Sequence, residues 1–192
     1  MLISQDRYQR DRLRYDVALR LMQHEARTGT IREWTALSES QIRNLYHSYA
    51  EYGARPLKRH RGRVPHQPSA LLRPAERRQQ ATVLACMYAS AGLLTREETQ
   101  SPDLVGLQRA QQLCDVYDYY VLAVQTPLLS FEQGLLLQRT LSGGKELTLA
   151  SCVGCSGPIL ADGYSLSRPI CLTCAREREE TAPRLTACGH ST

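Results

Sequence analysis

The sequence predicts a mainly α-helical fold, in which a helical domain containing a helix-turn-helix is followed by a small C-terminal module built around four cysteines. Apolar residues recur at helical spacing, capping signals mark helix starts, and two Cys-x-x-Cys pairs stand near the C-terminus. The expected regions are an N-terminal helix with the helix-turn-helix (1–53), a basic arm (54–73), a helical core (74–146), the cysteine module (147–178) and a flexible tail (179–192).

The first two helices are expected within residues 1–35. The first covers about residues 5–27, because its apolar side chains recur every four positions, as an amphipathic helix requires. Thr28 and Gly29 should end it. A second, short helix should begin near Thr30, where Thr30 and Glu33 can form a capping box.

A third helix is expected from Ser38 to about Glu51, with Gln41 completing a capping box. Together with the second helix and the short Ala36-Leu37 link, it has the proportions of a helix-turn-helix. Its apolar stripe would consist of Ile42, Leu45, Tyr46 and Tyr49. The opposite face would hold the DNA-contacting side chains Ser40, Arg43, Asn44 and His47.

In this interpretation Arg43 and Asn44 contact base edges in the major groove, and Ser40 binds a phosphate near the helix N-terminus. The alternative is that the polar face is the solvated side of an ordinary helical hairpin, since any surface helix has such a face.

A basic segment follows, and its prolines and glycine disfavour regular structure. We expect an extended arm that follows DNA phosphates or enters the minor groove. Its basic residues are Arg55, Lys58, Arg59, His60, Arg61 and Arg63. The charge distribution agrees, because residues 1–75 hold 14 Lys/Arg against 7 Asp/Glu, whereas residues 76–192 hold 10 against 12. A solvated basic face without a partner would show the same distribution.

Three further helices are expected over residues 74–92, 101–124 and 130–141, the last with a capping box, and a strand over 147–150. Their exposed faces are candidates for a partner-binding region. Apolar residues that fit either the core or a partner surface are Leu84, Met87, Val121 and Leu122. Cys86 and Cys114 are expected to be small core residues, and we find no set of residues typical of an active site.

Two cysteine pairs, Cys152-Val-Gly-Cys155 and Cys171-Leu-Thr-Cys174, have the spacing of a structural Zn²⁺ site with four thiolate ligands. Such a site leaves no open position for water, so it would stabilise the fold without taking part in catalysis. Two disulfides are the alternative. The chain shows no signal peptide and no membrane-length apolar run, so we expect a soluble cytoplasmic protein with reduced thiols. Cys188 and His190 are weak candidates for a second metal site.

Two blocks resemble the family of the bacterial flagellar master regulator FlhC. The first is Leu37-Ser-Glu-Ser-Gln-Ile-Arg-Asn-Leu-Tyr46, which resembles its helix-turn-helix. The second runs through Leu129-Ser130, Thr140-Leu-Ser-Gly-Gly144 and Leu147-Thr-Leu-Ala-Ser-Cys-Val-Gly-Cys-Ser-Gly157 to the second cysteine pair, in the family's order and spacing.

The resemblance implies a non-enzymatic transcription activator that binds double-stranded DNA with a small helical partner, FlhD, and recruits RNA polymerase to flagellar promoters. It also implies one structural zinc held by the four cysteines. Residues 55–73 lack an aromatic cluster of that family, which leaves open a relative that activates conjugative transfer genes on a mobile element. A zinc-stapled RNA-binding or assembly protein, and an enzyme in which the zinc module is only structural, are the alternatives of other classes.

Overall fold

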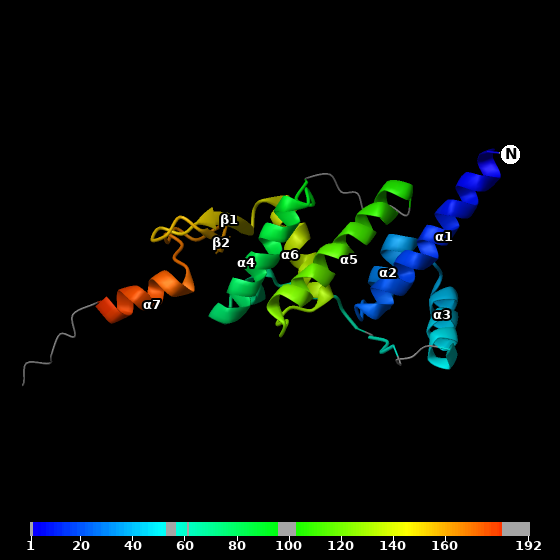
Figure 1. Ribbon diagram of the computed structural model, residues 1–192, viewed down its shortest axis with the longest axis horizontal. Helices are drawn as coiled ribbons and strands as arrows, with labels where there is room; N and C mark the ends of the chain where they lie inside the picture. The colour runs from blue at the N-terminus through cyan, green and yellow to red at the C-terminus, as the bar shows by residue number, and fades with distance from the viewer. Residues whose placement is uncertain (1, 53–56, 61, 96–102, 182–192) are drawn as a thin grey trace, which may run out of the picture.

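The structure is a computed structural model that describes residues 2–52, 57–60, 62–95 and 103–181. This part of the chain is mainly helical and forms an elongated molecule, with the N-terminal helices at one end and the cysteine module at the other (Figure 1). Its elements are α1 (Leu2–Gln23), α2 (Thr28–Thr35), α3 (Glu39–Tyr52), the 3-10 helix η1 (Pro68–Leu71), α4 (Ala75–Ser90), α5 (Leu104–Val124), α6 (Phe131–Gly143), β1 (Leu147–Ser151), β2 (Pro158–Asp162) and α7 (Leu172–Thr181).

The N-terminal helices differ from expectation at the junction of α1 and α2. Helix α1 ends at Gln23, and Glu25 has a left-handed φ of 57°, so the bend comes before Thr28. Thr28 and Gly29 do not end a helix, because they form the first turn of α2. The sequence gives no strong local stop signal at residues 24–26. The N–H groups of Glu25 and Ala26 bond the carbonyls of Met22 and Leu21 and close α1, and the contacts with α6 follow at Arg27 and Thr30.

The expected capping box at the start of α2 is also wrong. No side chain caps this helix end, because Thr30 lies inside the helix and donates its hydroxyl to Glu132 Oε1 of α6, 2.8 Å away. The same carboxylate oxygen accepts the backbone N–H of Arg27 at 2.7 Å. A tertiary contact therefore replaces the local one.

Helix α3 begins as predicted. The Ser38 hydroxyl accepts the N–H of Gln41, and the Gln41 side-chain oxygen accepts the N–H of Ser38 at 2.8 Å, which confirms this capping box. Ala36 takes a left-handed conformation with φ 53° and turns the chain between α2 and α3. Ile42 and Tyr46 are buried, so the predicted apolar stripe of α3 faces the protein.

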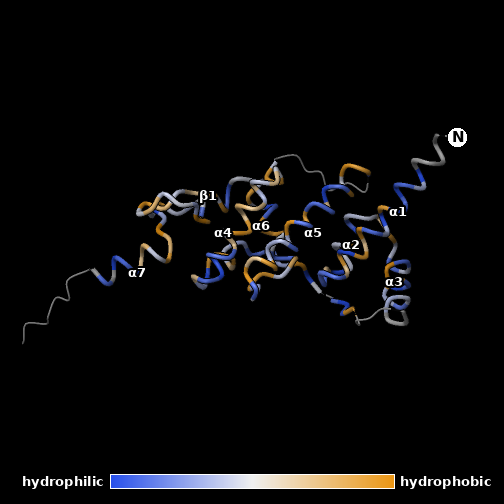
Figure 2. The backbone as a smooth tube through the Cα atoms, viewed as in Figure 1, coloured by the Kyte–Doolittle hydropathy of each residue, from blue (hydrophilic) through white to orange (hydrophobic). Residues whose placement is uncertain are grey.

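Helices α4, α5 and α6 form the centre of the molecule, and hydrophobic residues recur along each of them (Figure 2). Their core includes Leu84, Tyr88, Leu113, Tyr120 and Phe131. Ser101 and Pro102 lie outside the described residues, and Asp103 caps α5 by accepting the N–H of Gly106. Ser130 and Gln133 form the predicted capping box of α6. None of the described helices is long and apolar enough to span a membrane.

Among the candidate partner-surface residues, Leu84 belongs to the core with no exposed surface, whereas Leu122 is 74% exposed. Met87 and Val121 are partly buried against the core. Cys114 is buried as predicted, but Cys86 is only half-buried. Helical spacing alone therefore did not distinguish the buried positions from the exposed ones.

The cysteine module is joined to α4 through strand β2, which the sequence analysis did not anticipate. β1 pairs with β2 in antiparallel register, with Leu149 opposite Leu160. Thr82 Oγ1 accepts the N–H of Leu160 at 3.0 Å, and Arg78 Nε donates to the Leu160 carbonyl at 2.7 Å. Both backbone groups of Leu160 are thus bonded to side chains of α4, which fixes the module on the helical core.

Candidate metal centre and candidate nucleic-acid interface

The four predicted zinc ligands lie together in the structure. The sulfur atoms of Cys152, Cys155, Cys171 and Cys174 are all within 4.8 Å of one another. Cys155 Sγ and Cys171 Sγ are 3.8 Å apart, far beyond a disulfide bond of about 2.0 Å. For a tetrahedral site with Zn–S distances of about 2.3 Å, neighbouring sulfurs stand about 3.8 Å apart. The cluster is therefore close enough to hold one metal ion.

Two turns aim the sulfurs at one point. The first cysteine pair follows β1, and a Cβ on Gly154 would stand 2.8 Å from Cys174 Sγ, closer than atoms of a real side chain approach. Glycine at this position lets the first turn lie directly against the second pair. The second pair opens α7, where Cys171 precedes the first residue of the helix.

Backbone donors surround one of these sulfurs. Gly154 and Cys171 donate their N–H groups to Cys152 Sγ at 3.4 and 3.2 Å. Bonds of this kind, led by that from Cys171, lower the pKa of Cys152 to about 6. The neighbouring sulfur of Cys171, together with burial, raises the pKa of Cys174 to about 12. Four crowded thiols cannot all ionise by themselves, and a bound cation is what allows four thiolates to share this space.

The predicted DNA-contacting face of α3 is exposed to solvent. Ser40, Arg43, Asn44 and His47 all point away from the buried stripe of the helix. Ser40 also contacts Ser38, with the two hydroxyl oxygens 2.9 Å apart. The helix therefore presents a contiguous polar surface with donor and acceptor groups, while its function stays a prediction.

The basic segment follows the prediction in part. It has no regular secondary structure over residues 57–60 and 62–67. It is not a free extended arm, however, because Arg59 Nε donates to Thr28 Oγ1 at 3.2 Å and His60 Nε2 lies 2.7 Å from Glu25 Oε2. Lys58 and Arg63 are exposed, and Arg55 and Arg61 lie outside the described residues.

Packing of this segment brings basic residues from separate stretches together. Arg27, Arg43, Arg59 and His60 line one cavity of about 380 Å³ at the start of α2. Burial raises the pKa of Tyr46, and the nearby positive charge of Arg59 opposes that shift. Arg27 was not among the predicted DNA contacts, because no other Lys or Arg stands within four residues of it along the chain. A search for isolated arginines beside predicted helix starts would have found it.

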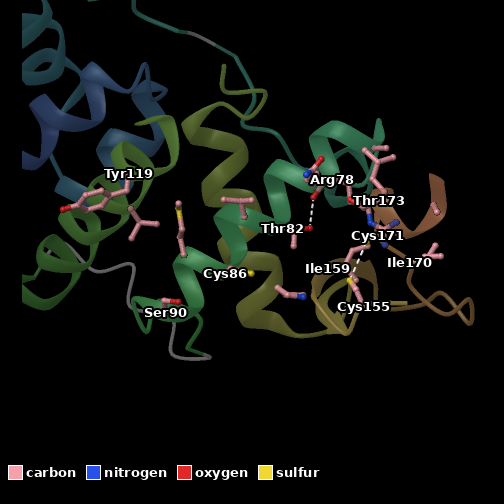
Figure 3. A pocket seen from close by; sticks show the side chains of 18 of the residues that line it. Arg78, Thr82, Cys86, Ser90, Tyr119, Cys155, Ile159, Ile170, Cys171 and Thr173 are labelled. Atoms are coloured by element: carbon pink, nitrogen blue, oxygen red, sulfur yellow. Dashed lines mark hydrogen bonds between the residues drawn. The ribbon is translucent and has the colours of Figure 1, made fainter. Parts of the chain in front are cut away.

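A second and larger feature is an apolar groove of about 1000 Å³ along α4. Figure 3 shows it running from Tyr119 of α5, past Cys86 and Thr82, to Ile170 and Cys171 of the cysteine module. Tyr119 is 67% exposed. The groove places half-buried Cys86 at a surface, which accounts for the incomplete burial of this residue.

Comparison with known proteins adds no family: no protein-family model matches this chain, and no curated protein matches its sequence. The functional interpretation therefore depends on the residues and geometry described above.

Proposed function

We propose that this protein is a subunit of a sequence-specific DNA-binding transcription activator of the FlhC type, with one structural Zn²⁺ in its cysteine module. The observation that carries the proposal is the face of α3, where Asn44 and His47 are exposed on a helix whose opposite stripe is buried. Arg43 and Arg59 lie beside that face and supply positive charge. Exposed amide, imidazole and guanidinium groups on one helix are the groups that contact bases and phosphates in DNA complexes.

Zinc is the metal that best fits the cluster. Four thiolates at tetrahedral spacing favour Zn²⁺ over Mg²⁺ or Ca²⁺, which take oxygen ligands. With all four ligands from cysteine, the ion would have no coordination position for substrate, and it would tie β1, β2 and the start of α7 together.

The proposal includes an FlhD-like helical partner and recruitment of RNA polymerase to flagellar promoters, as the sequence resemblance implies. One helix-turn-helix contacts few base pairs, so specific regulators normally combine two or more copies. Exposed apolar side chains on α5 support a partner surface, because Tyr119, which lines the apolar groove, is 67% exposed and Leu122, three residues further along the helix, is 74% exposed. The same family type on a mobile element would instead act at conjugative transfer promoters.

A mobility-shift assay on the native promoter, with and without the partner, tests this function. We expect weak binding by the isolated chain and tight, sequence-specific binding over an extended two-fold site when the partner is present. Leu122→Asp should reduce partner binding, while Leu166→Asp, a matched change at an exposed leucine of the loop after β2, should not. A monomer that binds its promoter tightly and specifically by itself would contradict the hetero-oligomer.

The RNA-binding alternative has one observation in its favour, since Tyr8, Tyr119 and Tyr164 are exposed and can stack on unpaired bases. They belong to α1, α5 and the loop after β2, at separate places along an elongated molecule, and so form no common stacking surface. Competition between duplex DNA and single-stranded RNA for the purified complex distinguishes the two functions.

A further inference from the structure

The cavity at the start of α2 is chemically suited to an anion. Its basic side chains come from three separate parts of the chain: Arg27 before α2, Arg43 on α3, and Arg59 with His60 in the basic segment. Glu39 also lines it, with Oε1 3.6 Å from Arg32 Nη1 on α2. Among the residues that the structure describes, no carboxylate forms an ion pair with Arg43 or Arg59. His60 is paired with Glu25, and the Glu132 carboxylate accepts the Arg27 N–H, so the surplus of positive charge comes from the guanidinium groups of Arg43 and Arg59.

Backbone donors add to this charge. Thr28 and Gly29 line the same cavity and form the first turn of α2. N–H groups in the first turn of a helix have no acceptor within the helix, and the side chain of the N-cap residue Arg27 does not bond them. Glu132 accepts the N–H of Arg27, which precedes this turn. A Cβ on Gly29 would meet no atom within 4 Å, so there is open space beside its backbone. Uncapped N–H groups beside guanidinium groups are a combination that binds phosphate.

The wall of the cavity is held in place by two contacts. Arg59 uses one of its five N–H donors to bond Thr28 Oγ1, which fixes the guanidinium at the helix start. Gly62 has φ +107°, and a Cβ there would stand 3.1 Å from Arg27 Nη1. Glycine thus allows the basic segment to pass directly against the Arg27 guanidinium.

We propose that this cavity binds a backbone phosphate of double-stranded DNA, with Arg27, Arg43 and Arg59 as its side-chain contacts. The inference rests on the proposed DNA-binding function and changes one part of it. In this proposal Arg43 contacts a phosphate instead of a base. Asn44 and His47, which lie further along the exposed face of α3, discriminate between bases. A DNA phosphate is favoured over a small phosphate ligand because Arg43, which lines the cavity, belongs to the exposed polar face of α3 on which a duplex would lie.

Salt dependence of DNA binding tests the phosphate contact. Binding of the zinc-loaded full chain to a short duplex is measured at several salt concentrations. Arg27→Gln and Arg59→Gln should each reduce the slope of log K against log salt concentration by about 0.9. The reduction should be the same on promoter DNA and on unrelated DNA. Lys145→Gln removes the same charge from an exposed loop before β1 and should leave the slope unchanged. Slopes of both arginine variants equal to that of the lysine variant, with unchanged thermal stability, would overturn the proposal.

The role of Arg43 is tested by selecting binding sites from random duplexes. We expect Arg43→Gln to bind all sequences more weakly with an unchanged preferred site, and Asn44→Ala to change the preferred site. If Arg43→Gln changes the preferred site while keeping the salt slope, Arg43 contacts a base and the assignment is wrong.

The amide signal of Gly29 in a ¹⁵N–¹H spectrum gives a readout that is independent of promoter function. Duplex DNA should shift this signal in the wild type and much less in Arg59→Gln. If duplex binds and the Gly29 signal does not move, the cavity assignment fails while DNA binding stands. If no duplex binds but inorganic phosphate shifts the signal, the proposed function and the DNA assignment both fail, and the cavity is a site for a small anion.

Discussion

The cysteine module and the basic cavity at α2 are both small sites made from a few polar side chains, but they are assembled in opposite ways. The four cysteines lie within residues 152–174, and two local turns bring them together. The cavity is lined by arginines from positions 27, 43 and 59, and the start of α2 that borders it is bonded to Glu132, which is 105 residues away from Arg27. A locally assembled site can be recognised from spacing, whereas a site assembled by tertiary contacts cannot.

Glu132 connects the start of α2, and with it the basic cavity, to the helical core. It is 5% exposed, and its Oε1 accepts both the Arg27 N–H and the Thr30 hydroxyl. This contact sets where α2 starts and therefore where the Arg27 side chain lies. The cysteine module, by contrast, is attached through Leu160 to side chains of α4. The two sites should consequently respond to different substitutions.

The largest effect is expected from Cys171→Ser, which removes one of the four thiolates. Because the binding free energy of a structural zinc is folding free energy, on the order of 10 kcal/mol, the module should lose its metal and its ordered structure. The measurements are zinc content per chain and hydrogen exchange of β1 and β2, which should lose protection while α1–α3 keep theirs.

Cys86→Ser is the matched control, since Cys86 is a half-buried thiol outside the cluster. It should retain about one zinc per chain. A wild-type protein that contains no zinc and four titratable free thiols would contradict the metal centre itself.

A smaller effect is expected from Gly154→Ala. The added Cβ would stand 2.8 Å from Cys174 Sγ and 2.9 Å from Cys174 Cβ, so one of the two turns must move. Overpacking of this kind costs about 1–3 kcal/mol, and we expect it as a weakened zinc affinity in a chelator competition. Gly143→Ala, where the new Cβ meets no atom within 4 Å, should leave the affinity unchanged. Equal affinities in the two variants would show that the close approach of Gly154 does not shape the site.

Glu132→Ala should affect the other end of the molecule. Removing the carboxylate leaves the Arg27 N–H and the Thr30 hydroxyl without their acceptor, at a cost of about 1–3 kcal/mol in the free energy of unfolding. Denaturant unfolding measures this loss, and the zinc content should not change. Glu76→Ala removes an exposed carboxylate from the first turn of α4 and should cost much less. If both variants lose the same stability, Glu132 does not hold α2 in place.

The sequence predicted the local features of both regions and missed the long-range ones. The spacing of Cys152, Cys155, Cys171 and Cys174 was sufficient to predict the cysteine cluster, and Ser38-x-x-Gln41 was sufficient to predict the start of α3, because both signals are local in sequence. Thr30 and Glu33 match the same capping pattern, but buried Glu132 binds Thr30 instead. The basic segment was expected to be an extended arm because its prolines and glycine disfavour regular structure, but His60 contacts Glu25, on the bend before α2.

The smallest predicted effect is the pH dependence of stability that comes from His24. It concerns the N-terminal end of the molecule and not the cysteine module. His24 stacks on Phe131 with ring centroids 5.0 Å apart and lies edge-on to Tyr117, while its Nε2 is 3.4 Å from Asp118 Oδ1. Burial lowers the pKa of His24 below its ordinary value of 6.5, the Asp118 charge opposes this shift, and the Arg20 charge adds to it. The folded protein therefore takes up the proton less readily than the unfolded chain does.

A depressed histidine pKa means that the stabilising contribution is complete above about pH 6.5 and declines as the pH falls toward the folded-state pKa. Helix α1 should loosen from α5 and α6 in this range, because protonation places a charge against the Phe131 and Tyr117 rings. Hydrogen exchange at pH 7.5 and 5.5 should show lost protection in α1 of the wild type and a smaller pH effect in His24→Gln, which lacks the titrating ring. His66→Gln, at an exposed imidazole, should keep the wild-type pH effect. Loss of protection in α1 that is equal in all three proteins would assign the pH effect to groups other than His24.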